Sequence, residues 1–236
     1  MEKRISFFGC VALASGFAWI ATAAQTQPVL AAVHRFPPVS ELPSRPEFPD
    51  PLVMSDGRRV STREQWLNER RPELIALFQH YMYGFLPPPP KEVAGKIERE
   101  DRHTLGGRAT LREVTVRFGP SELPPIHLML IVPNRRQGPA PVILALNYFG
   151  NHTLVRDPAV RLSANWMPER GEGVVNNRAT EASRGTWVDL WRIEQTIERG
   201  YAVATFYNGD IDPDRPEERG IQTHFRKQDP KYDCWT

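Results

Sequence analysis

The chain has 236 residues, of which 40% are hydrophobic and 25% charged, so it is long enough for one globular domain with a real core. Its 30 basic and 28 acidic residues are interspersed and give a net charge of only +2. This balance excludes a basic stripe of the kind that binds nucleic acid. The 23 prolines are about twice the usual share, and their clustering indicates long ordered connections.

The N-terminus has the features of a signal peptide, predicted over residues 1–24. Lys3 and Arg4 precede an apolar run at 5–24, which ends in the small-x-small cleavage pattern Ala21-Thr22-Ala23. The alternative is a membrane anchor, because the run approaches the roughly 20 residues that a membrane span needs. We expect export to the periplasm or the extracellular space and no membrane attachment after cleavage. The mature chain then keeps one cysteine, Cys234, which is either free or paired with a partner outside the chain.

The segment after the signal peptide is rich in proline and has little periodicity. We therefore predict an extended arm over residues 25–50, followed by a folded domain over 51–236. Four consecutive prolines, Pro87 to Pro90, predict an extended connector within that domain.

Two helices are expected between the arm and this connector. Ser61 and Glu64 have the spacing of a capping box that opens a short helix. Pro72 suits a first helical position, so a second helix is predicted to begin there and to end at Gly84.

The rest of the chain predicts a β-sheet with one crossover helix. Apolar runs give four strands, at 111–118, 126–132, 141–147 and 201–207. Leu190, Ile193 and Ile197 form a helical face before the fourth strand. A strand, a long crossover with a helix and another strand predict parallel pairing of the third and fourth strands. The fold class is therefore α/β.

A long stretch rich in Asn, Arg and Gly, residues 150–187, separates the third strand from the crossover helix. We expect it to be a surface insertion. The tryptophans at 166, 187 and 191 lie in or beside it. They could stack on sugar rings, but packing in the core or against a helix is the favoured interpretation.

The first candidate site is the loop Asn147-Tyr-Phe-Gly-Asn-His-Thr153, which directly follows the third strand. Open α/β sheets place their sites at the carboxyl ends of strands. In α/β-hydrolases a backbone N–H of this loop helps to form the oxyanion hole. Gly150 and its neighbours offer such amides, Asn147 and Asn151 offer side-chain amides, and His152 offers a titratable ring. The alternative is an Asx-rich turn that only caps the strand.

A second candidate is the acidic turn at residues 208–214, Asn-Gly-Asp-Ile-Asp-Pro-Asp. Its alternating carboxylates resemble a calcium loop, but Arg215 and Ile221 occupy the positions where an EF-hand needs Gly and Glu. We therefore expect a structural turn. Its Asp and Asn side chains would bond their own backbone amides, and Arg215 or Arg219 would balance the charge.

Several catalytic motifs are missing from the printed sequence. It contains no Gly-x-Ser-x-Gly, no His-Glu-x-x-His, no phosphate-binding P-loop and no Cys-x-x-Cys. The six histidines are scattered, without an i, i+4 pair. We expect no metal site and no cofactor.

Four segments resemble the bacterial glucuronoyl esterase and acetylxylan-esterase-like group, carbohydrate esterase family fifteen. They are Pro49–Met54, Arg71–Gly84, Leu146–Thr153 and Arg199–Asp214. Together they span the domain from about residue 47 onward, and the last two are the more specific.

The resemblance implies an α/β-hydrolase fold and a Ser-His-acid triad, with no cofactor. The family's nucleophile lies in a Gly-x-Ser-Arg-x-Gly-Lys elbow, which has no counterpart in this sequence. Only Asn147 to Thr153 matches a loop that borders the active site. In that fold the third strand lies between the fourth and a fifth, so Val142 to Leu146 would here lie at a sheet edge. The chain is therefore expected to be the N-terminal portion of a hydrolase, with about four strands and a crossover helix of a mostly parallel sheet.

The function expected from the resemblance is that of an exported carbohydrate esterase. The complete protein would cleave glucuronate or acetyl esters on xylan or glucuronoxylan, and the chain by itself would be inactive. The choice between the two esters depends on residues outside this sequence. The alternative is a secreted carbohydrate-binding protein without catalysis, which uses its Trp and Tyr side chains as a platform.

Overall fold

The computed structural model describes residues 36–215, 220–229 and 232. The predicted signal peptide and Cys234 lie outside these ranges. The described residues belong to two compact units, one with residues 36–87, 229 and 232, and the other with residues 88–215 and 220–228. Within the described ranges, no helix has both the length and the apolarity needed to cross a membrane.

The unit of residues 36–87 is built on one helical segment that ends at Gly84, which has φ 66°. The predicted arm begins this unit with a single 3₁₀ turn, Val39–Glu41, and residues 37–50 are exposed. The helical segment consists of α1 (Arg63–Gln65), a π-type turn (Trp66–Arg70), α2 (Arg71–Phe78) and a second π-type turn (Gln79–Tyr83).

The prediction of a separate helix that begins at Pro72 is wrong, because the helix already runs through this residue. A proline inside an α-helix removes one hydrogen bond and clashes with the preceding turn. Here the turn before it is of the wider π type, in which the Arg71 amide donates to the Trp66 carbonyl. The π turn provides the irregularity that accommodates Pro72.

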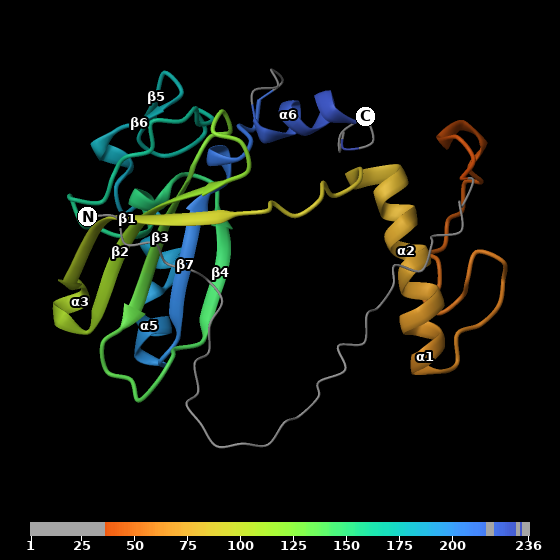
Figure 1. The fold of residues 1–236 in the computed structure, drawn as a ribbon, viewed down its shortest axis with the longest axis horizontal. Coiled ribbons are helices and arrows are strands. Elements are labelled where there is room, and N and C mark those ends of the chain that lie inside the picture. The colour runs from red at the N-terminus through yellow and green to blue at the C-terminus, as the bar shows by residue number, and fades with distance from the viewer. Residues whose placement is uncertain (1–35, 216–219, 230–231, 233–236) are drawn as a thin grey trace. The chain divides into compact units, whose positions relative to one another are not determined.

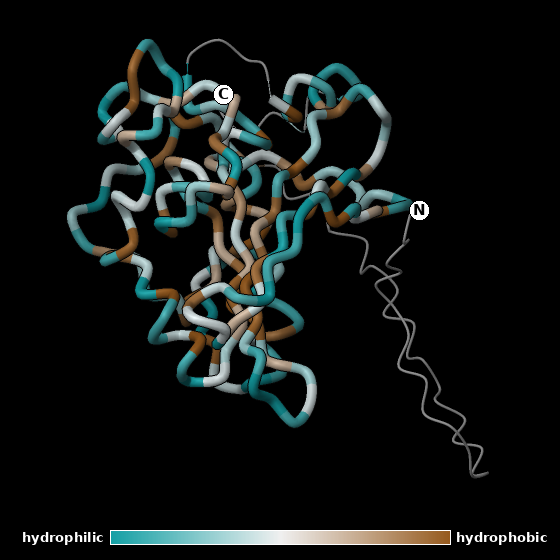
Figure 2. Tube along the Cα trace, turned by 90° about the vertical axis from the view of Figure 1, so that its left-hand side faces the viewer, coloured by the Kyte–Doolittle hydropathy of each residue, from teal (hydrophilic) through white to brown (hydrophobic). Residues whose placement is uncertain are grey.

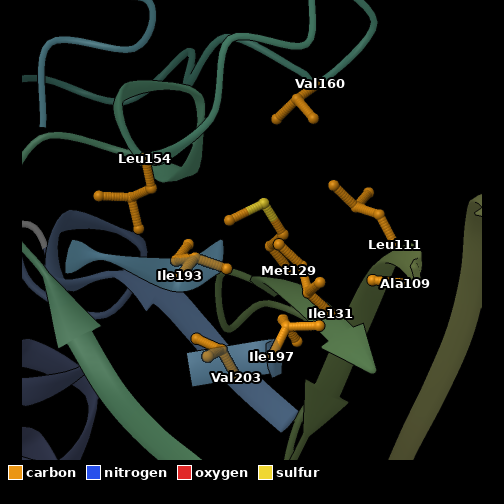
Figure 3. Packing of buried hydrophobic residues seen from close by; sticks show 9 residues of the cluster. All are labelled: Ala109, Leu111, Met129, Ile131, Leu154, Val160, Ile193, Ile197 and Val203. Carbon is orange, nitrogen blue, oxygen red and sulfur yellow. The ribbon is translucent and has the colours of Figure 1, made fainter. Parts of the chain in front are cut away.

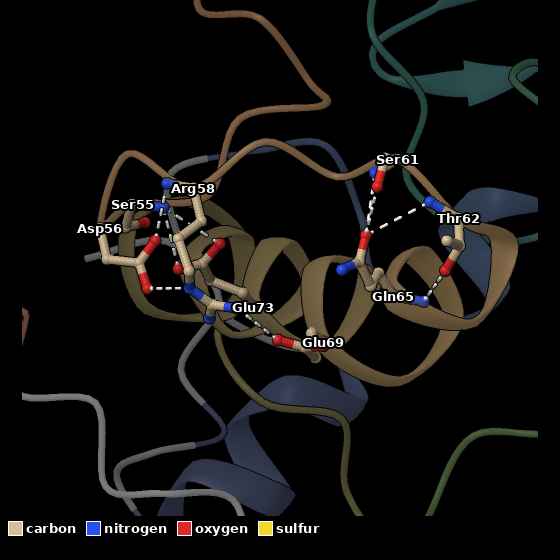
Figure 4. A network of polar contacts seen from close by, with 8 residues as sticks. All are labelled: Ser55, Asp56, Arg58, Ser61, Thr62, Gln65, Glu69 and Glu73. Atoms are coloured by element: carbon tan, nitrogen blue, oxygen red, sulfur yellow. Dashed lines mark hydrogen bonds and ion pairs between the residues drawn. The ribbon is translucent and has the colours of Figure 1, made fainter.

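The capping box lies one residue later than predicted (Figure 4). The Gln65 amide donates to Thr62 Oγ1 (3.2 Å), and Gln65 Oε1 accepts from the amides of Thr62 (3.2 Å) and Ser61 (2.9 Å). The pairs Ser61/Glu64 and Thr62/Gln65 both fit the sequence pattern. One side-chain oxygen that accepts from two successive amides favours the second pair.

A buried ion pair joins this helix to the turn before it. Arg70 and Glu73 have side chains only 6% and 8% exposed, and their charged groups lie 2.5 Å apart. Arg70 Nε also donates to the Pro51 carbonyl (2.9 Å), and Glu73 Oε1 accepts from the Ser55 amide (3.1 Å). Because each charge is paired and hydrogen-bonded, the pair holds the segment 51–55 against the helix.

The unit of residues 88–228 contains a five-stranded sheet in the order β1-β2-β3-β7-β4 (Figure 1). Its strands are β1 (Val93–His103), β2 (Ala109–Phe118), β3 (Ile126–Pro133), β4 (Val142–Asn147) and β7 (Ala202–Tyr207). A small hairpin of β5 (Val174–Val175) and β6 (Arg178–Ala179) lies in the excursion 150–187. The helices are α3 (Thr104–Gly107), α4 (Val188–Trp191), α5 (Ile193–Glu198) and α6 (Ile221–Gln228).

All four predicted strands are present, and the parallel pairing of β4 with β7 is confirmed. The other pairings, β1 with β2, β2 with β3 and β3 with β7, are antiparallel. The expectation of a mostly parallel sheet therefore does not hold for the described strands. The difference comes from β1, which sequence reasoning missed, and from the hairpin connections along β1, β2 and β3.

The core lies between the sheet and the segment that includes α5 (Figure 3). Alternate residues of a strand point to one face, and on this face Ala109 and Leu111 of β2 and Met129 and Ile131 of β3 are completely buried. The core consists of Ala109, Leu111, Met129, Ile131, Leu154, Val160, Ile193, Ile197 and Val203. Figure 2 shows the same pattern along the chain, with apolar residues concentrated in the central strands and polar residues in the loops.

The predicted helical face is confirmed for Ile193 and Ile197, which are 5% and 4% exposed. It is wrong for Leu190, which is 69% exposed. The predicted helix is interrupted at Arg192, whose left-handed backbone (φ 48°) separates α4 from α5. Leu190 therefore belongs to a different helix and no longer shares the apolar stripe.

β4 forms one edge of the described sheet, as the resemblance implies. Val142, Ile143, Leu144 and Leu146 are 48–65% exposed. The strand has no charged residue or proline, the features that commonly protect edge strands. An apolar and unprotected edge favours pairing with another chain.

We therefore expect the isolated chain to self-associate through β4. Replacing Leu144, which is 65% exposed, with Lys should raise the concentration at which association begins by about tenfold, because a charge on the edge strand opposes pairing. Sedimentation velocity over a concentration series measures this shift. Leu190→Lys is the matched control, since Leu190 is equally exposed but lies in α4. Equal effects of the two substitutions would assign the association to general hydrophobicity.

Candidate functional site

The two parallel strands bring two turns to the same edge of the sheet. Asn147 and Tyr207 are paired in register as the last residues of β4 and β7. The loop that follows β4 leads into a 3₁₀ turn, Asn151–Leu154, and β7 leads into another, Asn208–Asp210. This edge is where open α/β sheets place their sites.

Asn147 is the centre of the loop that follows β4. Its side chain is 1% exposed. Its Nδ2 donates to Asn151 Oδ1 (2.8 Å) and to Thr205 Oγ1 (3.1 Å), and its Oδ1 accepts from the Gly150 amide (2.8 Å). One side chain thus brings together three of the four predicted site residues. Asn151 in turn donates from Nδ2 to the His127 carbonyl in β3 (2.7 Å).

Position 150 requires a glycine because of both its backbone conformation and the atoms around it. Its φ is +91°, and a Cβ at this position would lie 2.6 Å from His152 Cε1. Its N–H, predicted as an oxyanion donor, donates to Asn147 Oδ1. A substrate oxygen could use this N–H only by displacing the Asn147 side chain. The role of the loop in stabilising an oxyanion stays a prediction.

His152 is completely buried and its ring points away from solvent. Its Nε2 lies 2.8 Å from Ser183 Oγ, and the Ser183 hydroxyl lies 2.6 Å from the Thr180 carbonyl. Since the carbonyl can only accept, the Ser183 proton goes to Thr180 and the His152 proton is assigned to Nε2. Burial, helped by the charge of Arg184, lowers the pKa of His152 to about 4. The ring is neutral at pH 7 and holds the loop to the turn at 180–183.

Asp210 is a buried acid at the same edge that sequence reasoning interpreted differently. It is 3% exposed. Its Oδ2 accepts from the His127 amide (2.8 Å) and its Oδ1 accepts from Asn165 Nδ2 (2.7 Å). The predicted bonds to its own turn amides are therefore wrong for Asp210, which instead joins β3 to the excursion. A carboxylate directly after a buried strand was the signal for such a role.

Burial raises the pKa of Asp210 to about 6, although both hydrogen bonds act to lower it. A folded-state pKa above the ordinary 3.8 means that the acid favours folding below pH 3.8. This contribution, about 3 kcal/mol, is lost as the pH rises through 6.

The variant Asp210→Asn keeps the shape and cannot ionise. We expect its unfolding free energy, relative to the unsubstituted chain, to increase by about 3 kcal/mol between pH 3.5 and pH 7. Urea unfolding at a series of pH values measures the difference. Asp189→Asn, an exposed change in α4, is the control. A difference that does not vary with pH would show that Asp210 is ionised without penalty.

The tryptophans of the excursion follow the packing interpretation in two cases. Trp187 and Trp191 pack against the core cluster, which confirms the favoured prediction for them. Trp166 lies close to the end of β7, because its carbonyl accepts from the Tyr207 hydroxyl (2.7 Å) and the Arg215 guanidinium lies 5.9 Å from its ring centroid. Over the described ranges, no three His, Cys, Asp or Glu side chains are grouped to hold a metal ion.

Comparison with known proteins finds relatives that are all described as esterases. No family model matches the chain. It is 40% identical over 185 residues to carbohydrate esterase MZ0003 of an unknown prokaryotic organism, a match that covers 77% of this chain and 43% of the relative.

Two solved structures are also similar. One is a promiscuous CE15 esterase from a marine bacterial metagenome, with a TM-score of 0.66, 39% identity, and coverage of 80% of this chain and 48% of the other. The second is the glucuronoyl esterase from Solibacter usitatus, with a TM-score of 0.64, 32% identity, and coverage of 74% and 44%. The chain thus spans less than half the length of these relatives, and the predicted α/β-hydrolase fold class is confirmed.

Proposed function

This chain is a relative of the esterases of carbohydrate esterase family fifteen, and from this premise we propose that it is part of an esterase that acts on plant cell-wall polysaccharide. The observation that carries the proposal is the 39% identity to the CE15 esterase across 80% of the chain. The position of the loop 147–153, at the carboxyl end of β4, is consistent with a border of the active site.

The proposed chemistry of the complete protein is acyl transfer. A serine activated by a histidine attacks the ester carbonyl, and amide donors stabilise the oxyanion. This chain would supply the sheet and the loop 147–153, in which Asn147 fixes the backbone of Gly150. The nucleophile elbow is not in the printed sequence, so we propose that the chain alone is inactive.

The proposed substrates are glucuronate or acetyl esters on xylan. The proposed location is outside the cytoplasm, on the basis of the signal-peptide pattern at residues 1–24. A binding protein without catalysis is the second candidate, and the observation in its favour is Tyr148, an aromatic residue 59% exposed within the site loop. Aromatic rings of this kind offer a flat apolar face with a polar edge.

Two measurements separate these candidates. The product of the complete reading frame should hydrolyse methyl glucuronate or acetylated xylan. Its variant Asn147→Ala should lose at least tenfold in kcat/KM, because the Gly150 backbone is no longer held in place. Tyr148→Ala should then affect catalysis less than Asn147→Ala does. A different set of results would favour the binding protein. The complete product would not hydrolyse these esters, the chain would be retained on insoluble xylan, and Tyr148→Ala would abolish that retention.

A further inference from the structure

The hydrogen bond between His152 and Ser183 has no part in the chemistry proposed so far. Both residues are buried, with exposed fractions of 0% and 1%, and His152 Nε2 lies 2.8 Å from Ser183 Oγ. A serine within hydrogen-bond distance of a histidine is also the arrangement of a nucleophile and its base. The pair is therefore either a catalytic dyad or a contact that holds the site in shape.

The direction of the hydrogen bonds is the reverse of that in a catalytic dyad. A general base must accept the proton of the serine hydroxyl. Here the hydroxyl donates to the Thr180 carbonyl (2.6 Å), which can only accept, so the ring of His152 donates from Nε2 to Ser183. Because both side chains are shielded from solvent, an ester carbonyl cannot approach the serine.

The pair instead ties the loop 147–153 to the turn at 180–183, which lies 31 residues further along the chain. Two backbone bonds reinforce this tie. The Gly185 amide donates to the His152 carbonyl (3.0 Å), and the Trp187 amide donates to the Thr153 carbonyl (2.8 Å). The excursion is thus more than the surface insertion that we expected, because its last residues support the site loop.

The ring of His152 lies directly against the backbone of Gly150. A Cβ at position 150 would lie 2.6 Å from His152 Cε1 and 2.7 Å from His152 Nδ1. The Gly150 N–H donates to Asn147 Oδ1 (2.8 Å), and its carbonyl accepts from Thr153 Oγ1 (2.8 Å). Ser183 therefore fixes the ring, and the ring limits where the Gly150 backbone can lie.

We propose that His152 and Ser183 are positioning residues of the esterase reaction, whose hydrogen bond holds the Gly150 backbone at the border of the active site. This inference rests on the proposed esterase function. Neither residue touches the substrate or transfers a proton. A displacement of about 1 Å can cost about 100-fold in rate, so loss of this bond should slow the chemical step more than it weakens substrate binding.

The test compares kcat and KM for methyl glucuronate among single variants of the product of the complete reading frame. Ser183→Ala removes the group that accepts from His152. It should lower kcat by at least about tenfold and change KM by less than about twofold, because the loop is displaced while the substrate still binds.

Thr110→Val is the matched control, since it also removes a buried hydroxyl. Thr110 is 8% exposed in β2, and its hydroxyl donates to Asn134 Oδ1 (2.6 Å). The strand register places it near the amino end of β7, whereas the loop 147–153 follows the carboxyl end of β4. Thr110→Val should lower the melting temperature and leave kcat within about twofold, because it does not disturb the loop.

Two substitutions of His152 separate positioning from proton transfer, and they replace Ser183→Ala if that variant does not fold. Glutamine has a side-chain NH₂ that can donate to Ser183 as the ring does, but its amide cannot serve as a base. His152→Gln should keep kcat within about threefold, with an unchanged pH profile, whereas His152→Leu should lose at least about tenfold in kcat.

The outcomes distinguish this inference from the proposed function. If the unsubstituted complete product hydrolyses neither methyl glucuronate nor acetylated xylan, the proposed function is wrong and this inference falls with it. With an active product, three results would overturn this inference alone. They are an unchanged kcat in Ser183→Ala and His152→Leu, an equal loss of kcat in Thr110→Val, or a His152→Gln variant as slow as His152→Leu.

Discussion

The 236-residue chain is expected to hydrolyse methyl glucuronate and acetylated xylan no faster than buffer does. In a serine hydrolase, loss of the nucleophile or its base lowers kcat by about 10⁶. The activity that survives such a loss in other enzymes comes from the oxyanion hole and substrate binding. Here the candidate donor at Gly150 is already bonded to Asn147, so even this residual catalysis should be absent.

The measurement is release of methanol and of acetate by the purified chain, with an active glucuronoyl esterase run in parallel as a positive control. Asn147→Ala frees the Gly150 N–H and is expected to remain inactive, since no nucleophile is gained. Hydrolysis above the buffer rate that a serine-directed phosphonate abolishes would contradict the prediction. It would show that another serine of this chain is a nucleophile.

The largest effect on stability is expected at Gly173, where Gly173→Ala should lower the unfolding free energy by at least about 3 kcal/mol. Gly173 has φ +71°, and an added Cβ would lie 2.6 Å from Ser183 Cα and still closer to the Ser183 amide nitrogen. Backbone atoms cannot move aside as a flexible side chain can. The turn at 180–183 must shift, and with it the hydroxyl that bonds His152.

Denaturant unfolding measures this loss. Gly138→Ala is the matched control, because Gly138 has no positive φ and nothing within 4 Å of the added Cβ. It should change stability by less than about 0.5 kcal/mol. Equal destabilisation by the two substitutions would mean that the packing of Gly173 against Ser183 is not as tight as described.

The strands of the sheet were predictable where one physical signal was strong. Apolar β-branched runs identified β2, β3, β4 and β7, and the long crossover identified the parallel pair. β1 was missed because its sequence, VAGKIEREDRH, is charged along most of its length and lacks the alternation of a half-buried strand. It is an edge strand, where charged residues are common.

The predicted helix boundaries were wrong where two sequence signals competed. The capping pattern occurs twice in succession at residues 61–65, and only the Gln65 hydrogen bonds distinguish the two. Leu190 continued the apolar spacing of α5, but the left-handed Arg192 interrupts the helix. Neither a π turn before Pro72 nor a left-handed arginine has a recognisable signature in the sequence.

The candidate site was predictable in position but not in its contacts. The loop after β4 follows from the strand pattern, and the turn made by Asn147 with Gly150 is local. The hydrogen bonds that hold this loop in place join residues far apart in the sequence. Asn147 and Thr205 are 58 residues apart, and His152 and Ser183 are 31 residues apart. Asp210 accepts a hydrogen bond from Asn165, which lies 45 residues earlier in the sequence. Such partners depend on tertiary structure, which local patterns do not encode.

The central proposal is that this chain is part of a carbohydrate esterase of family fifteen. The most direct measurement is to sequence the transcript beyond codon 236. We predict an open reading frame that continues into a Gly-x-Ser-Arg-x-Gly-Lys elbow and, later, an acid and a histidine. A stop codon directly after Thr236, or a continuation without this elbow, would contradict the account.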